Sequence, residues 1–310
     1  MNYVTGKTQF HMDVPSAVSL GKFDGLHRGH QRLIGHVLEQ KKRGLQAVLF
    51  TFEKNPTRML AGLSAQNIMT NAERRQRLEN AGIDCLLECP FVPEIAHMEP
   101  ERFVEEVLVR QLKTAFVAVG RDFRFGFQRR GDHALLRQMG ETLGFQVEVV
   151  EKEQSHGRDI SSTYIREALH EGNMPLVNEL LGYRYSVSGE VLHGRRIGRT
   201  LGLPTTNLLP PAEKLLPPNG VYLTRTILED GDYYGITNIG YKPTVGGETR
   251  RGVETFLFDF DRDLYGKEIT VEILEYERPE QKFHSLDELK ARILSDVYWG
   301  KSKIKVKEHL

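Results

Sequence analysis

The sequence predicts an α/β module with a parallel sheet, followed by a small antiparallel β-barrel with a terminal helix. The 310 residues suggest two domains of about 150 residues each. Short apolar runs alternate with helical patterns over residues 17–150, which is typical of parallel strands joined by helices. After about Tyr183 the chain changes to β-branched and aromatic strands with Gly, Asp and Asn turns. We therefore expect domains over residues 1–183 and 184–310.

The elements of the first module follow from hydrophobic periodicity. Its strands are predicted at residues 17–23, 46–52, 85–91, 115–120 and 146–151. Its helices are predicted at residues 28–44, 71–82, 100–113, 132–144, 162–173 and 174–182. Ser162 or Thr163 is expected to cap the fifth of these helices, and Gly182 to end the last. These two late helices complete the first module.

The second module reads as strands at residues 185–194, 220–240 and 252–277, with turns inside the longer runs. One amphipathic helix follows at residues 285–300, with Ser285 as its N-cap and Glu288 at the capping-box position. The basic end, residues 301–310, is expected to be a solvated tail because it lacks interleaved aromatic residues.

Charge and composition exclude several classes of protein. Lys plus Arg equals Asp plus Glu at 42 each, so no overall field attracts nucleic acid or an anionic membrane. The only cysteines, Cys85 and Cys89, are expected to be reduced core residues. The chain shows neither a secretory signal pattern nor an apolar run of membrane-spanning length. We therefore expect a cytoplasmic protein without a nucleic-acid or membrane partner.

The stretch GKFDGLHRGH, residues 21–30, lies where the first strand passes into a helix. Ligands of open α/β sheets bind at such junctions, because the helix N-terminus offers free N–H groups and a positive dipole end. Gly21 and Gly25 would let the backbone approach a phosphate, and His27 and His30 would project toward the same anion. The alternative is that both histidines are capping or surface residues, and an isolated H-x-G-H does not exclude it.

This stretch resembles the G-x-F-D-G-x-H-x-G-H signature of the nucleotidyltransferase superfamily, in the form found in bacterial FAD synthetases. Three further stretches are similar to that family in the expected order: TFEKNP (51–56), VGRDFRFG (119–126) and ISSTYIR (160–166). The sequence departs from the family at Lys54 and Asn55, where a proline and a histidine are usual. Asn55 can hydrogen-bond a phosphate but carries no charge.

The resemblance implies a Rossmann-like nucleotidyltransferase domain that transfers the adenylyl group of ATP to FMN. His27 and His30 are then assigned to the ATP phosphates, and Ser162, Thr163 and Arg166 to the leaving pyrophosphate. For Arg166, a surface pair on its own helix is the alternative. The remaining positions implied to bind nucleotide or flavin are Gly21, Phe23, Asp24, Gly29, Asn55, Asp122, Phe125 and Ser161, with Asp24 and Asp122 on the flavin side.

The second module carries a glycine- and arginine-rich stretch, GRRIGRTLGLPTTNL, at residues 194–208. Such a loop between strands can wrap phosphates through its backbone N–H groups. A basic turn at a barrel edge is the alternative, and spacing alone does not exclude it. The residues of this stretch taken as phosphate-binding candidates are Gly194, Arg195, Gly198, Arg199 and Gly202.

The same stretch resembles riboflavin kinases, which share P-T-A-N at the position of Pro204 to Asn207, here with Thr206 in place of alanine. The resemblance implies that Thr205 and Asn207 bind Mg²⁺ together with ATP, and hydroxyl and amide oxygens suit that ion. It also implies that the strand at residues 253–266 carries the general base, Glu254. Flavin- and nucleotide-binding flaps are implied at Asn219, Gly220, Tyr222 and Asn238.

Period-2 alternation gives a separate expectation for Glu254. Val253, Thr255 and Leu257 alternate with Glu254 and its aromatic neighbours at 256, 258 and 260. The aromatic face is taken as the inward one, where an unpaired carboxylate would be costly without a function.

Together the two resemblances imply a bifunctional enzyme that uses riboflavin, FMN, FAD, ATP, ADP and pyrophosphate, with Mg²⁺ accompanying ATP. One alternative is an adenylyltransferase for another phosphorylated acceptor, although those relatives lack a barrel with GLPTTN. The other is a catalytically decayed flavin-sensing or RNA-binding protein, which predicts loss of Glu254 or of the Thr205/Asn207 pair. The oligomeric state is left open, with a homo-oligomer as one outcome.

Overall fold

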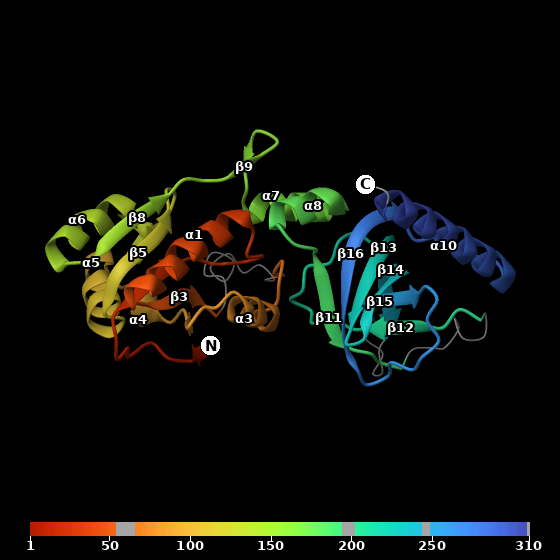
Figure 1. Ribbon diagram of the computed structural model, residues 1–310, viewed down its shortest axis with the longest axis horizontal. Coiled ribbons are helices and arrows are strands. Elements are labelled where there is room, and N and C mark those ends of the chain that lie inside the picture. The colour runs from red at the N-terminus through yellow and green to blue at the C-terminus, as the bar shows by residue number, and fades with distance from the viewer. Residues whose placement is uncertain (54–65, 194–201, 244–248, 309–310) are drawn as a thin grey trace. The chain divides into compact units, whose positions relative to one another are not determined.

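The computed structural model describes residues 1–53, 66–193, 202–243 and 249–308 (Figure 1). The chain forms two compact units, Met1–Ser162 and Thr163–Leu310. Each unit is built on its own six-stranded sheet. The division between the units falls after Ser162, the first residue of the helix that ends at His170, and the domain boundary expected after residue 183 stays a prediction.

The first unit alternates strands and helices along its length. Its strands are β1 (Asn2–Thr5), β2 (Ser16–Leu20), β3 (Gln46–Phe52), β4 (Cys85–Cys89), β5 (Thr114–Gly120), β6 (Arg124–Phe125), β7 (Gly131–Asp132), β8 (Gln146–Val150), β9 (Gln154–Ser155) and β10 (Arg158–Asp159). Its helical segments are α1 (Arg28–Glu39), η1 (Gln40–Arg43), α3 (Asn71–Asn80), α4 (Pro93–Ala96), α5 (Pro100–Arg102), η2 (Phe103–Gln111), η3 (Phe127–Arg129) and α6 (His133–Leu143).

The main sheet of this unit is parallel throughout, with the order β1-β4-β3-β2-β5-β8. This confirms the parallel sheet predicted from the alternating pattern. The edge strand β1 was not among the predicted strands. It pairs with β4 from Asn2 opposite Cys85 to Thr5 opposite Glu88.

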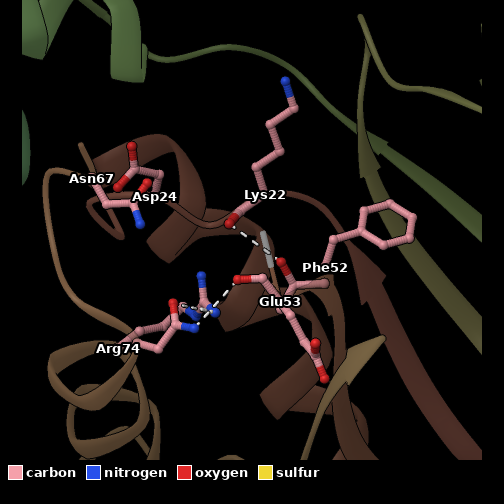
Figure 2. A pocket seen from close by; sticks show the side chains of 8 residues that line it. Lys22, Asp24, Phe52, Glu53, Asn67 and Arg74 are labelled. Atoms are coloured by element: carbon pink, nitrogen blue, oxygen red, sulfur yellow. Dashed lines mark hydrogen bonds between the residues drawn. The ribbon is translucent and has the colours of Figure 1, made fainter. Parts of the chain in front are cut away.

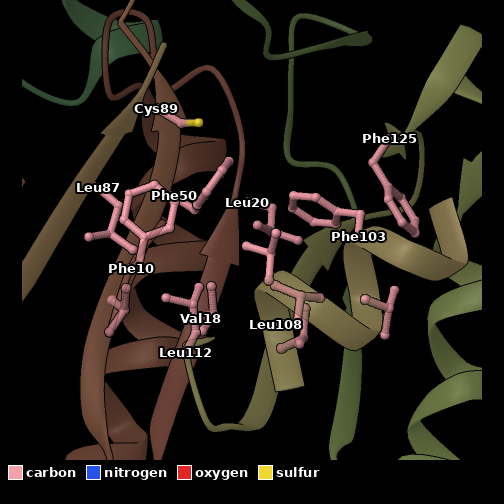
Figure 3. Packing of buried hydrophobic residues seen from close by; sticks show 14 of the residues in the cluster. Phe10, Val18, Leu20, Phe50, Leu87, Cys89, Phe103, Leu108, Leu112 and Phe125 are labelled. Atoms are coloured by element: carbon pink, nitrogen blue, oxygen red, sulfur yellow. The ribbon is translucent and has the colours of Figure 1, made fainter. Parts of the chain in front are cut away.

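Both faces of the parallel sheet are covered, as its strands require. One face packs against η2 and α6 through a cluster that includes Leu20, Phe50, Phe103 and Leu108 (Figure 3). On α1, Ile34 and Val37 are buried, and that helix packs against β2, β3 and β5. Because both faces are closed, polar ligands are left to the edge where the strands end.

The second unit contains an antiparallel sheet with the order β11-β16-β13-β14-β15-β12. Its strands are β11 (Ser186–Glu190), β12 (Thr205–Leu208), β13 (Gly220–Leu228), β14 (Gly231–Pro243), β15 (Thr249–Leu257) and β16 (Glu268–Arg278). Its helices are α7, which begins at Ser162 and ends at His170, α8 (Met174–Leu181) and α10 (Leu286–Glu308). The sheet curls into a half-barrel, and Leu192 N donates to Asn207 O over 2.8 Å between its two edges. The antiparallel barrel with a terminal helix is confirmed in this open form.

The terminal helix α10 is longer than predicted. Ser285 Oγ accepts from Glu288 N at 3.1 Å, so the predicted cap is confirmed, whereas the Glu288 carboxylate accepts from His284 N at 2.9 Å. The prediction of a solvated tail after residue 300 was wrong, because the helix continues to Glu308. Its apolar side continues too: Ile304 packs with Val297 and Trp299 against the buried cluster of the sheet.

Cys85 and Cys89 are both buried on β4 and both free, as predicted. Burial raises the pKa of the Cys85 thiol to about 11 and that of Cys89 to about 12, so both stay protonated at neutral pH. Among the described residues, no helix is both long enough and apolar enough to cross a membrane.

Candidate active sites

The loop after β2 is tightly folded. His27 is the N-cap of α1, and its extended backbone turns the chain into the helix. Phe23 and Leu26 adopt left-handed backbone angles, with φ of 47° and 38°, and both side chains are buried. Burying these two side chains fixes the loop at the carboxyl end of the sheet, where the N–H groups of the first turn of α1 are available.

His27 and His30 are brought together by the first turn of α1. Their rings stack with centroids 3.7 Å apart and planes 20° apart, and the Phe23 ring lies edge-on to His30 with centroids 5.2 Å apart. His30 N donates to His27 Nδ1 over a long 3.4 Å, so the capping interpretation of His27 is correct for this nitrogen. The other ring nitrogen, Nε2, is not needed for the cap. His27 can therefore cap the helix and still bind a ligand.

Both imidazoles are neutral at physiological pH. Burial lowers the pKa of His27 to about 4, and burial together with the charge of His27 lowers the pKa of His30 well below its usual value. Since His27 Nδ1 accepts a hydrogen bond, its single proton resides on Nε2. His30 Nδ1 is buried without a hydrogen-bond partner among the described residues. The pair thus presents N–H donors rather than a positive charge.

Asp24 holds the loop in place. It is buried, and its Oδ1 accepts from Ile68 N at 2.9 Å and, more weakly, from Met69 N at 3.5 Å. Ser162 Oγ donates to Asp24 O at 2.9 Å, so the first residue of α7 lies against this loop. Ser161 lies immediately before α7, and Thr163 and Arg166 continue on that helix within the second unit.

A polar hollow lies where β2 and β3 end (Figure 2). Its lining combines carboxylates, cations and amides: Lys22, Asp24, Thr51, Phe52, Glu53, Asn67, Asn71 and Arg74. Asn71 Nδ2 donates to Glu53 O at 3.3 Å, and Thr51 Oγ1 donates to Lys22 O at 3.3 Å. Of these residues, only Asp24 was named as a candidate, although Lys22, Thr51, Phe52 and Glu53 lie in the two stretches that resemble FAD synthetases.

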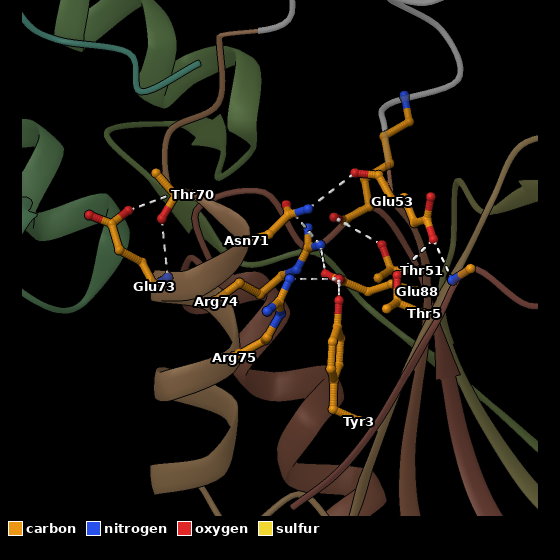
Figure 4. A network of polar contacts seen from close by, with 12 residues as sticks. Tyr3, Thr5, Thr51, Glu53, Thr70, Asn71, Glu73, Arg74, Arg75 and Glu88 are labelled. Atoms are coloured by element: carbon orange, nitrogen blue, oxygen red, sulfur yellow. Dashed lines mark hydrogen bonds and ion pairs between the residues drawn. The ribbon is translucent and has the colours of Figure 1, made fainter. Parts of the chain in front are cut away.

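A buried ion-pair network includes Arg74, which also lines this hollow (Figure 4). Glu88 on β4 is fully buried and pairs with Arg74 of α3, while Tyr3 Oη of β1 donates to Glu88 Oε2 at 2.5 Å. Arg75 stacks over the Tyr3 ring at 4.0 Å. On the same edge strand, Thr5 Oγ1 donates to Glu53 Oε1 at 2.7 Å. The N-terminal strand therefore ties α3 and the end of β3 to the sheet.

Two predicted residues lie after the neighbouring strand β5. Asp122 pairs with Lys152 Nζ at 3.0 Å, and its side chain is largely exposed. Phe125 is buried in the core cluster, stacked on Phe123 with ring centroids 5.5 Å apart. Because β5 is parallel to β2 and beside it, Asp122 follows the same edge of the sheet as the histidine loop. Phe125 makes its contacts in the core. Asn55 lies outside the described residues.

The second site is set by strand register in the half-barrel. Glu254 on β15 lies opposite Asn207 on β12 and, on its other side, opposite Asn238 on β14. Thr205 Oγ1 donates to Glu254 Oε1 at 2.8 Å. Residues directly opposite in an antiparallel pair share a face, so Thr205, Asn207 and Glu254 form one cluster. The resemblance had assigned the metal to Thr205 and Asn207 and the general base to Glu254; the strand register brings these three residues together, and their roles stay predictions.

The face assigned to Glu254 was wrong. Val253, Thr255 and Leu257 are between 1% and 3% exposed, so they form the inward face, while the Glu254 side chain is 33% exposed on the other face. The interior is instead lined by threonines: Thr255 Oγ1 contacts Thr237 Oγ1 at 2.8 Å, and Thr237 Oγ1 contacts Thr224 Oγ1 at 2.8 Å. Phe256 shares the outer face with Glu254, where part of the face is covered by α10. Aromatic residues therefore did not mark the interior.

A cavity of about 240 Å³ opens beside this cluster. Pro204, Thr205 and Asn207 line one part of it. The rest is lined by Val191, Thr206, Thr255, Leu257, Phe260, Asp261, Arg262, Asp263, Leu264 and Tyr265. The cavity is thus lined by both polar and apolar side chains, a combination typical of small-molecule sites.

The predicted flap residues divide between two places. Asn219 Nδ2 and Asn238 Nδ2 both donate to the Glu280 carboxylate, at 3.0 Å and 3.3 Å. Tyr222 lies opposite Thr237 on the inward face, fully buried, and donates to Pro218 O at 2.6 Å, so it is not on the face of Glu254. Gly220 has no room for a side chain, because a Cβ would lie 2.4 Å from Arg278 O.

Gly202 has a positive φ of 76°, which favours glycine. The other candidates of the glycine-rich stretch, Gly194, Arg195, Gly198 and Arg199, lie outside the described residues.

Sequence reasoning missed Lys242. Its Nζ donates to Asn207 Oδ1 at 3.2 Å and pairs with Glu254 Oε2. The lysine lies four residues after Asn238, which the resemblance had marked as a flap position. The even spacing of Asn238 and Lys242 on one strand was a signal that could have placed them on one face.

A histidine-bearing loop at the end of a parallel sheet, joined in one chain to an antiparallel half-barrel with a Thr–Asn–Glu cluster, is the arrangement expected of a two-domain nucleotide-using transferase. A family model described as FAD synthetase matches residues 10–164, and one described as riboflavin kinase matches residues 181–303. The chain belongs to the family of bifunctional riboflavin kinase/FMN adenylyltransferases.

Relatives of that description cover nearly the whole chain. The protein of Escherichia coli K12 is 39% identical over 282 residues, which are 90% of each chain. That of Haemophilus influenzae is 35% identical, with 92% and 93% covered. A solved structure from Streptococcus pneumoniae, described as a macrolide-efflux protein, is 28% identical, with a TM-score of 0.86 and 96% and 98% covered. The two folds therefore occur together in another solved chain.

Proposed function

We propose that this chain makes FAD in two ATP-dependent steps, one on each unit. The second unit transfers the γ-phosphoryl group of ATP to riboflavin, which gives FMN and ADP. The first unit transfers the adenylyl group of a second ATP to FMN, which gives FAD and pyrophosphate. The observation that carries the proposal is the presence, in one chain, of both family matches and both predicted side-chain clusters.

In the kinase step, Glu254 accepts the proton of the flavin's primary hydroxyl as its oxygen attacks the γ-phosphorus. Thr205 donates to one oxygen of this carboxylate at 2.8 Å and so fixes its orientation. The other oxygen lies on the side of Asn207 and Lys242. No covalent intermediate on the protein is needed, because positioning and charge neutralisation suffice for phosphoryl transfer.

The residues around Glu254 fit a divalent metal by the chemistry of their donors. A threonine hydroxyl, an amide oxygen and a carboxylate are the hard oxygen ligands that Mg²⁺ prefers, and a cationic group, the Lys242 ammonium, already lies among them. We assign Mg²⁺ to Thr205 and Asn207. When bound, the ion neutralises charge on the nucleotide phosphates.

In the adenylyl step, a phosphate oxygen of FMN attacks the α-phosphorus of ATP, and the bond to pyrophosphate breaks. His27 and His30 donate hydrogen bonds from neutral rings to the phosphate oxygens, together with the free N–H groups at the start of α1. Ser162, Thr163 and Arg166 are proposed to receive the leaving pyrophosphate. Asp122 remains the proposed flavin-side residue.

The cytoplasm is the proposed location, as expected of an enzyme that uses ATP in both of its proposed steps. We propose no nucleic-acid or membrane partner, and self-association stays a prediction without a structural argument.

Single substitutions should separate the two activities. Glu254→Gln removes the proton acceptor and should slow FMN formation about 10²- to 10⁴-fold, while FAD formation from supplied FMN continues. His30→Ala should do the reverse, with a loss of about 10²- to 10³-fold, the scale of one donor to transition-state charge. Chromatography of the flavins formed from riboflavin and from FMN measures both rates. His27→Asn is the second variant for the first unit, in case His30→Ala folds poorly.

Loss of both activities in either variant, with an unchanged circular dichroism spectrum, would contradict the two-site assignment. A wild-type chain that converts neither riboflavin nor FMN would contradict the function itself.

A further inference from the structure

Lys242 lies among the atoms assigned to the metal and to the proton acceptor of the kinase step. Its Nζ donates to Asn207 Oδ1 at 3.2 Å and pairs with Glu254 Oε2. The opposite oxygen of the same carboxylate accepts from Thr205 Oγ1. The Lys242 side chain is 25% exposed, so the pair is neither fully solvated nor closed off from ligands.

The local packing lets the Lys242 side chain reach from β14 to Glu254 on β15. Lys242 on β14 lies opposite Arg250 on β15, and Gly252 and Glu254 follow on the same face of β15. A Cβ on Gly252 would lie 3.0 Å from Lys242 Cδ and 3.5 Å from Cε. The lysine stem therefore passes over Gly252 to reach Glu254. The absence of a side chain at residue 252 is what leaves this path open.

We propose that Lys242 competes with the divalent metal for Asn207 Oδ1 and for the negative charge of the adjacent Glu254 carboxylate, and thereby makes metal binding at the kinase site depend on the nucleotide. This inference rests on the proposed kinase function of the second unit. In the absence of nucleotide, Lys242 acts through its contacts with Glu254 and Asn207.

Charge explains the competition. An ammonium is a compact point charge on a flexible stem, and like charges about 4 Å apart repel even in a partly solvated site. A metal ion that arrives alone must displace Lys242 from its carboxylate without offering it another partner. A metal ion that arrives with ATP brings phosphate oxygens, to which the lysine can turn. With nucleotide bound, Lys242 pairs with the phosphate oxygens and no longer competes with the metal. Metal and nucleotide therefore bind with positive coupling.

Electron paramagnetic resonance of Mn²⁺ tests this on the full chain without flavin and without turnover. In the wild type, Mn²⁺ should bind the kinase site weakly alone and more tightly with a non-hydrolysable ATP analogue. Lys242→Met should bind Mn²⁺ alone about tenfold more tightly, the scale of one partly buried charge interaction, and should lose most of the nucleotide dependence. Gly252→Ala, which displaces the lysine stem, should shift the affinity in the same direction by a smaller factor.

Two variants locate the effect. Glu254→Gln in the Lys242→Met background should abolish the added Mn²⁺ binding, which assigns it to the kinase site rather than to the first unit. Lys303→Met removes a lysine that pairs with Glu275 at 2.5 Å in the same unit, and it makes the same change in net charge. It should leave Mn²⁺ affinity unchanged. Trp299 fluorescence and circular dichroism check that each variant is folded.

Unchanged or weaker Mn²⁺ affinity in folded Lys242→Met, in the absence of nucleotide, overturns the proposal. An equal gain in Lys303→Met also overturns it, because the effect would then be one of net charge. Failure of the proposed function has a different signature, since it is the wild-type chain forming no FMN from riboflavin.

Discussion

At the residue scale, Gly29 determines where the His27 imidazole can lie. It is the second residue of α1, and a Cβ at this position would come within 3.3 Å of two atoms of the His27 ring. The ring would have to move by a few tenths of an ångström, and it stacks on His30 at 3.7 Å. Gly29 therefore serves the geometry of the histidine pair.

Gly29→Ala should lower the rate of FAD formation from FMN by about tenfold or more, because small displacements of positioned groups are costly to catalysis. The kinase rate should not change. Gly35→Ala is the matched control on the same helix, since a Cβ there meets nothing within 4 Å. It should leave both rates unchanged and stabilise the helix by about 0.5–1 kcal/mol. Equal adenylylation rates in the two variants would show that Gly29 does not set the ring position.

The sequence allowed the histidine pair to be predicted from its spacing and from its place after a strand. It did not allow the protonation state to be predicted, because that depends on burial by Phe23 and by the other ring. The face of Glu254 was mispredicted for a similar reason. Alternation separates the two faces of a strand, but α10 covers the outer face of β15, so apolar residues stand on both sides.

At the scale of elements, α10 is joined to β16 by a buried cluster of charges. Asp296 of α10 is 1% exposed and forms ion pairs with Arg278 of β16, at 2.5 Å, and with Arg292, at 3.0 Å. Glu277 of β16 faces the same cluster, and its Oε2 is buried without a hydrogen bond among the described residues. Burial, and then the charge of Asp296, raise the pKa of Glu277 to about 7.

This carboxyl should make the docking of α10 weaker as pH rises. Its pKa is higher in the folded state than its ordinary value of 4.5, so the folded protein holds more protons between pH 4.5 and 7. The stability that Glu277 contributes is therefore fully present below pH 4.5 and is lost as pH rises through 7. Glu277→Gln should raise the free energy of unfolding at pH 8 by on the order of 2 kcal/mol.

Urea unfolding at pH 5.5 and pH 8 measures this difference, followed by the fluorescence of Trp299, which lies on α10 and is the only tryptophan. The variant should show the flatter pH dependence. If wild type and variant lose stability equally between these pH values, Glu277 is not the titrating group.

Elements with strong periodicity were predictable, and those fixed by tertiary contacts were not. The short edge strand β1 has no clear alternation, and it is held by β4 and by the bond from Tyr3 to the buried Glu88. The end of α10 was predicted to be a basic tail because lysines dominate its composition. The apolar residue Ile304 among them packs on the sheet. Lysine stems can cover apolar surface while their charges stay in water, which weakens the sequence signal.

At the scale of the whole molecule, the chain has two proposed nucleotide sites on two different sheets. The first depends on the end of a parallel sheet and on a helix N-terminus, and the second on strand register in an antiparallel half-barrel. The sequence pattern predicted that a parallel sheet comes first in the chain and an antiparallel one second. The Lys242 contact did not, because it joins strands whose register is set by the fold.

Two separate sites imply that two inactive chains can complement each other. The most direct measurement mixes Glu254→Gln with His30→Ala and follows flavins from riboflavin, ATP and Mg²⁺ by chromatography. We expect the mixture to form FAD at a substantial rate, because FMN released by one variant is adenylylated by the other, while neither variant alone does so. Absence of FAD from the mixture, although the first variant adenylylates supplied FMN and the second releases FMN, would contradict independent sites.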